Sequence, residues 1–278
     1  MAPYTLMGVV NVTPDSFSDG GRFLAPEDAL EQGRILAAEG ADILDVGAES
    51  TRPGAEPVEL EEELRRAIPA VEALAGAGLG VELSIDTTKA AVAAAAIEAG
   101  AGIVNDVTAL RGDPEMAAVV ASTGARCCLM HMLGEPRTMQ HRPHYDGDVV
   151  DEVKAFLEER LAFAVGAGIA EERIVLDPGI GFGKTLPHNL ALLARLDELC
   201  ALGRPILVGT SRKTFLGVLG ARAHGLEDPL PTDRRLPGTL ATCVLAFERG
   251  AGIFRVHEVA PAAEALAVAA ATLGGDGA

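Results

Sequence analysis

Residues 81–106 read VELSIDTTKAAVAAAAIEAGAGIVND. Residues 81–86 and 102–106 are short aliphatic runs with little polar alternation, a pattern typical of strands buried on both faces of a parallel sheet. Residues 88–99, between them, are rich in alanine, the strongest helix former, and stop at Gly100. The stretch therefore predicts a strand, a helix and a second strand, the unit from which parallel sheets are built.

The same alternation extends from this unit toward both ends of the chain. Further strand candidates cover residues 6–11, 42–46, 126–131, 174–177, 206–209 and 253–256. Further helix candidates cover residues 26–39, 148–165, 236–249 and 261–273. Eight strands that alternate with helices over 278 residues predict an α/β protein, a single-domain (β/α)8 TIM barrel that spans residues 1–278.

A doubly wound open sheet is the alternative α/β architecture. Its dinucleotide-binding version needs Gly-x-Gly-x-x-Gly after the first strand, and that motif does not follow residues 6–11. Two segments, 132–147 and 220–235, are longer than ordinary connections. Long loops in a compact domain often serve function, so both are candidates for such a role.

The chain is strongly acidic, because 23 basic and 40 acidic residues give a formal charge of −17. Such a chain repels nucleic acid and anionic membrane surfaces, so we expect neither as a partner. No apolar run reaches the roughly 18 residues that a membrane span needs, and no signal peptide is indicated. The four cysteines fit neither a zinc site nor a disulfide framework, so we expect reduced thiols in a cytoplasmic protein.

Polar side chains follow all eight predicted strands. In chain order they are Asn11, residues 49–54, Asp86, Asn105 with Asp106, His131, Asp177, residues 210–213, and Arg255 with His257. In a barrel, the carboxyl ends of the strands meet at one face, and that face holds the active site. The pattern therefore predicts a polar site assembled from many strands.

The residue types indicate a ligand. Buried Asp and Asn together with a Lys form a donor and acceptor set that suits a flat heterocycle with an amide-like edge. Arg52, Arg255 and His257 suit an anion such as diphosphate. Asn11 offers a neutral oxygen to a hard cation that keeps most of its waters, as Mg2+ does on a phosphate.

Single members of this set also have simpler interpretations. Asp86 alone is compatible with an N-cap of the next helix, and Asp177, which precedes Pro-Gly, with a turn former. Lys213 alone is compatible with a solvated surface lysine. His131, His141 and His144 lack the placed third ligand of a zinc site. The glycines of residues 177–185 are spaced one residue short of a phosphate-binding loop, so we expect them to allow close approach to a ligand.

Two motifs resemble the signatures of a known family, the dihydropteroate synthases. They are MGVVNVTPDSFSDGG at residues 7–21 and DVGAESTRPG at residues 45–54. The resemblance continues, in the family's order, at residues 84–87, 105–106, 130–131, 176–184, 209–213 and 255–257. It implies a transferase that condenses (7,8-dihydropterin-6-yl)methyl diphosphate with 4-aminobenzoate, giving 7,8-dihydropteroate and diphosphate in folate biosynthesis.

The resemblance also implies roles for particular residues. The residues implied to hold the pterin ring are Asp86, Asn105, Asp177 and Lys213, and those at the diphosphate are Thr51, Arg255 and His257. Asn11 is implied to bind Mg2+ on the diphosphate. The 4-aminobenzoate pocket is implied to comprise Phe17, Pro53, Phe182 and Ser211, with Asp19 and Arg52 beside Phe17 and Pro53 on two mobile loops. Asp86, Lys213, Asp19 and Arg52 are the implied catalytic residues.

Further expectations concern mechanism, inhibitors and assembly. No residue is placed as a strong base for an aniline, whereas several positive groups can stabilise the charge on the leaving diphosphate. We therefore expect cation-like C–O cleavage ahead of amine attack, assisted by Mg2+. Residues 181–184 carry no insert of the kind that resembles sulfonamide-resistant members, so sulfonamides are expected inhibitors. The resemblance also suggests a homodimer.

Two other functions remain open from the sequence. Corrinoid-dependent methyltetrahydrofolate methyltransferases also have a pterin pocket in a barrel, but they lack the loop of residues 50–54 and the pairing of residues 211–213 with 255–257. A non-catalytic pterin-binding protein should have lost charged residues at the strand ends, and none is missing here. The departures from the family, Ala48, Thr88 and residues 108–113, carry no implied role.

Overall fold

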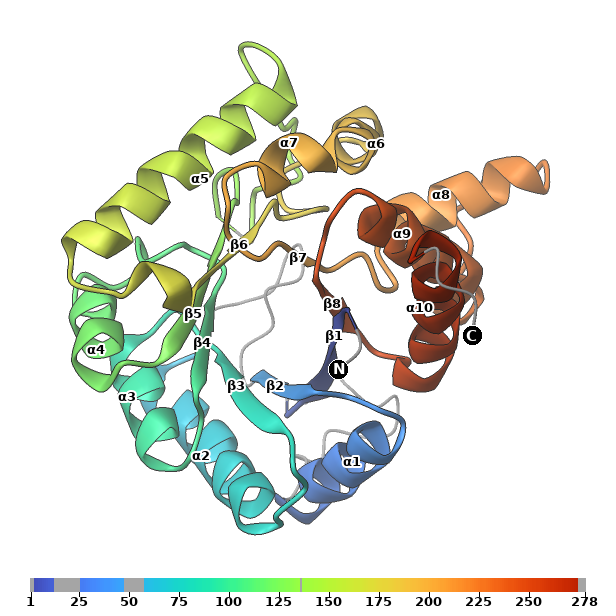
Figure 1. Ribbon diagram of the computed structural model, residues 1–278. Helices are drawn as coiled ribbons and strands as arrows, with labels where there is room; N and C mark the ends of the chain where they lie inside the picture. Colours follow the sequence, from blue (N-terminus) through green and yellow to red (C-terminus); the bar gives the residue numbers. More distant parts are fainter. Residues whose placement is uncertain (1–2, 13–25, 48–57, 136, 275–278) are drawn as a thin grey trace.

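Eight parallel strands form a barrel in the computed structural model, which describes residues 3–12, 26–47, 58–135 and 137–274 (Figure 1). The strands are β1 (Thr5–Asn11), β2 (Ile43–Gly47), β3 (Glu82–Asp86), β4 (Ile103–Asp106), β5 (Arg126–Met130), β6 (Ile174–Asp177), β7 (Leu207–Val208) and β8 (Ile253–Val256). Their order is β6-β5-β4-β3-β2-β1-β8-β7. A parallel bridge between Leu176 and Ile206 joins β6 to the start of β7. The predicted (β/α)8 barrel is confirmed.

Helices surround the strands as an outer ring (Figure 1). They are α1 (Pro26–Ala38), α2 (Leu60–Gly76), α3 (Ala90–Glu98), α4 (Met116–Thr123), α5 (Val149–Gly166), α6 (Leu186–Ala194), α7 (Leu196–Cys200), α8 (Thr214–Ala223), α9 (Leu236–Glu248) and α10 (Val259–Leu273), with short 3-10 turns η2 (Glu171–Arg173) and η3 (Thr232–Arg234). Of the two expected long loops, the described residues of 132–147 hold no helix or strand, whereas 220–235 begins inside α8. No helix in the described ranges is long and apolar enough to cross a membrane.

Two clusters lie on opposite sides of the sheet, because alternate side chains of a strand face opposite sides, and a third, smaller cluster contains Val107, Met130, Met132 and Met139. One cluster lies between the strands and the helices and includes Leu44, Val104, Leu176 and Phe254. A separate cluster is formed by the alternate residues, which face the inside of the barrel: Met7, Ile43, Ile103, Cys128, Val175, Leu207 and Ile253. This inner cluster, here called the apolar plug, fills the barrel interior below the polar side chains at the carboxyl ends of the strands.

Candidate active site

A layer of four polar side chains lies directly above the apolar plug. Asp45, Asn105, Asp177 and Arg255 each stand two residues after Ile43, Ile103, Val175 and Ile253, so each faces the barrel interior like the apolar residue before it. They come from β2, β4, β6 and β8, in the way that alternate strands of such a barrel supply one layer. Three are almost completely buried, with exposed fractions of 0% for Asp45, 4% for Asn105 and 6% for Asp177.

Arg255 links this layer to Asp86 on the neighbouring β3. Its Nε donates to Asp45 Oδ2 at 2.6 Å, and its Nη2 donates to Asp86 Oδ2 at 2.9 Å. Asn105 Nδ2 donates to the same Asp45 oxygen at 3.1 Å. Asp86 therefore faces the barrel interior and is not the N-cap of α3, whose Ala90 N–H donates instead to Asp113 Oδ2 at 2.9 Å.

Burial in this site perturbs the acids and the lysine. Burial raises the pKa of Asp86 to about 7; the positive charge of Arg255 opposes this shift and the negative charge of Asp45 adds to it. Burial also raises the pKa of Asp177, against the charge of Lys213. Burial lowers the pKa of Lys213 to about 8, against the charge of Asp177. Clustered groups with pKa values displaced toward neutrality are typical of active sites.

Lys213 is held within the loop that follows β6. Its Nζ donates to the carbonyl of Ile180 and lies 4.5 Å from the centre of the Phe182 ring. A Cβ added to Gly181 would lie 2.9 Å from Lys213 Cδ. Lys213 is therefore not a solvated surface residue, and the structure brings it together with Phe182.

Asp177 fits both interpretations made from the sequence, a turn former and a site residue. Its Oδ1 accepts a hydrogen bond from Gly179 N–H at 2.6 Å, which forms the turn after β6. Its other carboxylate oxygen makes no hydrogen bond within the part of the chain that the structure describes. One oxygen thus shapes the loop, and the other is available to a ligand.

Two glycines of the loop that follows β6 lie against the segment that follows β5, whereas the expected close approach of this loop to a ligand stays a prediction. Gly179 has φ 65°, and a Cβ there would lie 1.8 Å from the carbonyl oxygen of His131. Gly183 has φ 64°, and a Cβ there would lie 2.6 Å from Leu133 Cβ. Both positions require glycine because the segment after β5 packs against them.

His131 is paired with a buried lysine. Its Nδ1 lies 2.9 Å from Lys184 Nζ, which also donates to the Phe182 carbonyl at 3.1 Å. Burial, and then the charge of Lys184, lower the pKa of His131 to about 2. His131 does not gather with His141 and His144, since the described residues contain no group of three or more His, Cys, Asp and Glu that could hold a metal.

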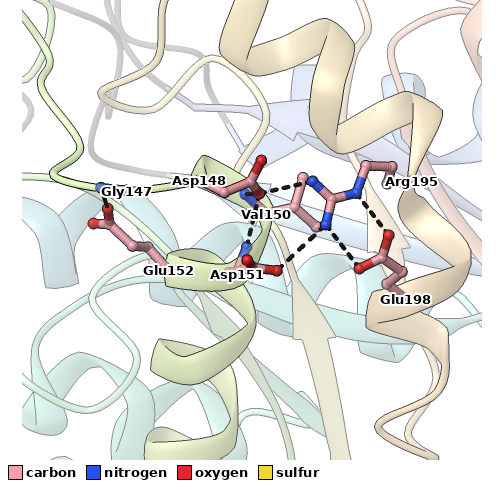
Figure 2. A network of polar contacts seen from close by, with 7 residues as sticks. All are labelled: Gly147, Asp148, Val150, Asp151, Glu152, Arg195 and Glu198. Atoms are coloured by element: carbon pink, nitrogen blue, oxygen red, sulfur yellow. Dashed lines mark hydrogen bonds and ion pairs between the residues drawn. The ribbon is translucent and has the colours of Figure 1, made fainter.

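The 132–147 segment is fixed against the site loop. Tyr145 donates its hydroxyl hydrogen to the Gly183 carbonyl at 3.1 Å. At its end, Asp148 caps α5 by accepting from Val150 N–H at 2.9 Å and also accepts from Arg195 Nη1 at 2.8 Å (Figure 2). Arg195 in turn bonds Glu198 through Nε at 2.6 Å. The segment serves as a support for the loop that carries Phe182.

Ser211 and His257 meet where β7 and β8 end. Ser211 Oγ lies 2.9 Å from His257 Nδ1 and also accepts from the His257 N–H at 3.3 Å. Arg212, at φ 62°, donates from Nε to Glu258 Oε1 at 2.6 Å. Ser211, implied for 4-aminobenzoate, and His257, implied for diphosphate, therefore share one corner of the site.

Asn11 ends β1 beside an open position. It pairs with Gly47 of β2, which pairs with Asp86 of β3. A Cβ on Gly47 would lie 3.9 Å from Asn11 Oδ1 and 3.8 Å from Asp86 Oδ2, so the bare glycine leaves room between them. A single amide oxygen beside open space fits a cation that takes its remaining ligands from water and a phosphate, as Mg2+ does.

Five of the predicted site residues lie outside the described residues: Phe17, Asp19, Thr51, Arg52 and Pro53. One residue of the polar layer, Asp45, was not singled out by the sequence reasoning. The signal for it was available, because Asp45 follows Ile43 by two residues, as Asn105 follows Ile103.

Comparisons with known proteins agree on one family. The chain matches the pterin binding enzyme family over residues 7–257. The dihydropteroate synthase of Mycobacterium leprae is 49% identical over 274 residues, which cover 98% of this chain and 95% of that relative.

Two solved structures extend the likeness to the whole fold. The Yersinia pestis dihydropteroate synthase in a sulfonamide drug complex gives a TM-score of 0.90 at 44% identity, covering 98% of this chain and 94% of that one. The Xanthomonas albilineans dihydropteroate synthase in complex with 7,8-dihydropteroate gives a TM-score of 0.85 at 45% identity, covering 98% of this chain and 95% of that one.

Proposed function

The chain belongs to the dihydropteroate synthases, a family of pterin-binding transferases, and on that premise we propose that it condenses (7,8-dihydropterin-6-yl)methyl diphosphate with 4-aminobenzoate to give 7,8-dihydropteroate and diphosphate. The observation that carries the proposal is the polar layer inside the barrel. Asn105 and Asp177 are buried, and the partly exposed Arg255 and Lys213 add donors beside them. Such a set matches the edge of a pterin ring.

Asp177 and Lys213 recognise the ring in this account. The carboxylate oxygen of Asp177 that makes no bond to described residues accepts from a ring N–H, because a pterin presents adjacent N–H groups. Lys213, whose charge is opposite to that of Asp177, donates to a ring acceptor. The buried setting makes each such bond selective, since a mismatched ring leaves a buried polar group unpaired.

Arg255 and His257 receive the diphosphate together with Thr51. Local basic groups are needed here because the chain carries a net charge of −17. Asn11 would hold Mg2+, which, when bound, would neutralise charge on the leaving diphosphate. Phe182 and Ser211, with Phe17 and Pro53, line the 4-aminobenzoate pocket, and Asp19 and Arg52 close over it.

We propose that the C–O bond to the diphosphate breaks before the amine attacks. The amine of 4-aminobenzoate is a weak nucleophile, and the electron-rich pterin spreads the positive charge that cleavage leaves. Asp86 lies at the carboxyl end of β3 with its Oδ1 unbonded to any described residue, so its negative charge is available to this cation. The electron pair of the broken bond leaves with the diphosphate. The lone pair of the amine then forms the C–N bond to the exocyclic carbon, and the amine proton passes to solvent water.

The test is an assay of 7,8-dihydropteroate formation by the purified chain, with and without Mg2+. We expect product only when both substrates are present, with turnover that depends on Mg2+. Two outcomes would refute the proposal. Binding of pterin diphosphate without turnover would indicate a pterin-binding protein, and methyl transfer from methyltetrahydrofolate to a corrinoid would indicate the related barrel enzymes. Sedimentation of the same sample tests the expected homodimer.

A further inference from the structure

Asp45 is the member of the polar layer to which the proposed chemistry gives no task. Its neighbours in the layer, Asn105, Asp177 and Arg255, all belong to the proposed pterin and diphosphate site. Asp45 itself has an exposed fraction of 0%. A carboxylate buried this deeply is costly unless its interactions offset the loss of water.

The interactions of Asp45 are made with two of those site residues. Its Oδ2 accepts from Arg255 Nε at 2.6 Å and from Asn105 Nδ2 at 3.1 Å. The first bond spans 210 residues of sequence and joins β8 to β2. One oxygen atom thus fixes the orientation of a guanidinium and of an amide that come from different strands.

We propose that Asp45 is a positioning residue of this active site, which orients Arg255 and Asn105 and draws part of the charge of Arg255 away from Asp86. The inference rests on the proposed function, because it assigns Asp45 to the support of that reaction. Asp45 does not touch the substrate in this account. It acts through the two side chains it holds.

A purely stabilising ion pair explains the geometry less well. Asp45 Oδ1 is buried and makes no hydrogen bond to any described residue, as is also true of Asp86 Oδ1. Two carboxylates share one guanidinium, so the local charge does not balance. Unpaired buried oxygens and excess negative charge lower stability, and such costs are typical of functional sites.

The charge of Asp45 should be visible in the ionisation of Asp86. The charged groups that act on Asp86 are Arg255 from β8, Asp45 from β2, Glu63 from α2 and Asp106 from β4. Arg255 lowers the pKa of Asp86, and the other three raise it. If substitution removes the charge of Asp45, its repulsion of the Asp86 carboxylate disappears and Asp86 no longer shares Arg255 with it. The pKa of Asp86 should then fall.

The experiment compares Asp45→Asn with wild type in the pH dependence of kcat/KM for the pterin substrate. Asparagine keeps an oxygen that can accept from both donors, removes the charge, and places an amide NH2 group where Asp45 Oδ1 bonds no described residue. We expect the acidic limb to move to lower pH by roughly one unit and kcat/KM at the optimum to fall by about tenfold. KM for 4-aminobenzoate should stay unchanged. Asp42→Asn is the matched control, since Asp42 is exposed directly before β2 and its side chain accepts from Leu6 N–H at 2.8 Å.

Failure of this inference is distinguishable from failure of the proposed function. A wild-type chain that forms no dihydropteroate refutes the function. An active wild type with an Asp45→Asn variant of unchanged acidic limb and unchanged kcat/KM overturns the role of Asp45 and leaves the function standing. If Asp45→Asn does not unfold cooperatively on heating, Asp45→Ser replaces it, because a hydroxyl and a water can accept from Arg255. The same shift is then required.

Discussion

Arg255 Nη2 donates a hydrogen bond to Asp86 Oδ2 at 2.9 Å and so joins the last strand of the barrel to the third. In the proposed reaction, Arg255 receives the leaving diphosphate and Asp86 faces the cation that the diphosphate leaves behind. The two charges that separate during cleavage are therefore matched by two protein charges already in contact. A pre-arranged pair of this kind stabilises charge separation without reorganising during the reaction.

Asp177→Asn tests pterin recognition. The substituted residue can still accept from Gly179 N–H, so the turn is kept, but an N–H group replaces the available oxygen. The pterin should bind more weakly by about 1–3 kcal/mol, because a ring N–H loses its acceptor. Calorimetric titration with the pterin diphosphate measures this, with exposed Asp228→Asn as the control. Equal affinity in both variants would remove Asp177 from the pterin site.

Phe182 provides a test of the 4-aminobenzoate pocket. A sulfonamide presents an aniline ring like that of 4-aminobenzoate and should inhibit competitively with it. Phe182→Leu removes the aromatic face that now lies 4.5 Å from Lys213 Nζ, so it should raise the sulfonamide inhibition constant and KM for 4-aminobenzoate together. Initial-rate measurements at varied 4-aminobenzoate show both. Inhibition that 4-aminobenzoate does not relieve would contradict the assignment.

The activity of the free enzyme should depend on pH through Asp86 and Lys213. Asp86 must be ionised to stabilise the cation, and its pKa is raised to about 7, so kcat/KM should fall as pH drops through that value. Lys213 must be charged to make a charge-assisted hydrogen bond to the ring, and its pKa is lowered to about 8, so kcat/KM should also fall above that value. Lys213→Arg, which does not titrate in this range, should lose the alkaline limb. An alkaline limb that persists in a folded Lys213→Arg variant would assign it to another group.

Asp86 also predicts a trade-off between activity and stability. Its pKa in the folded chain, about 7, lies above the ordinary 3.8. The stability it contributes is therefore fully present below pH 3.8 and is lost as pH rises through about 7. Asp86→Asn should raise the melting temperature relative to wild type, and by more at pH 8 than at pH 5. Scanning calorimetry at the two pH values measures the difference, and exposed Asp197→Asn should show no such growth. A smaller gain at pH 8 would contradict the sign.

The fold was largely predictable because its signals are local. Each described strand begins and ends within one residue of the predicted range, since a continuous aliphatic run is itself the feature that a doubly covered parallel strand requires. Helices α2, α4, α6, α7 and α8 were not predicted. Of these, α2 contains Pro69, which removes a backbone donor. Buried Ala67, Val71 and Leu74 hold that helix against the barrel, so tertiary packing outweighs the local preference.

The site was predictable in part, for a related reason. Polar residues at strand ends can be read from the sequence, because barrel geometry brings those ends together. The partner of each residue cannot be read in that way. Asp45 accepts a hydrogen bond from Arg255, 210 residues away, and Gly179 must be glycine because the His131 carbonyl lies close to it. Neither relationship has a local signature in the sequence. The alternative interpretations of Asp86 and Lys213 were likewise resolved only by their contacts in space.

Positional isotope exchange tests most directly whether Asp86 and Arg255 stabilise C–O cleavage ahead of amine attack. Wild-type enzyme is incubated with Mg2+ and pterin diphosphate labelled at the bridging oxygen, without 4-aminobenzoate. The account predicts that the label scrambles into the non-bridging positions, and that Asp86→Asn slows both scrambling and turnover more than it weakens pterin binding. A label that stays in the bridge, in enzyme that turns over normally once 4-aminobenzoate is added, would contradict the account and favour concerted displacement.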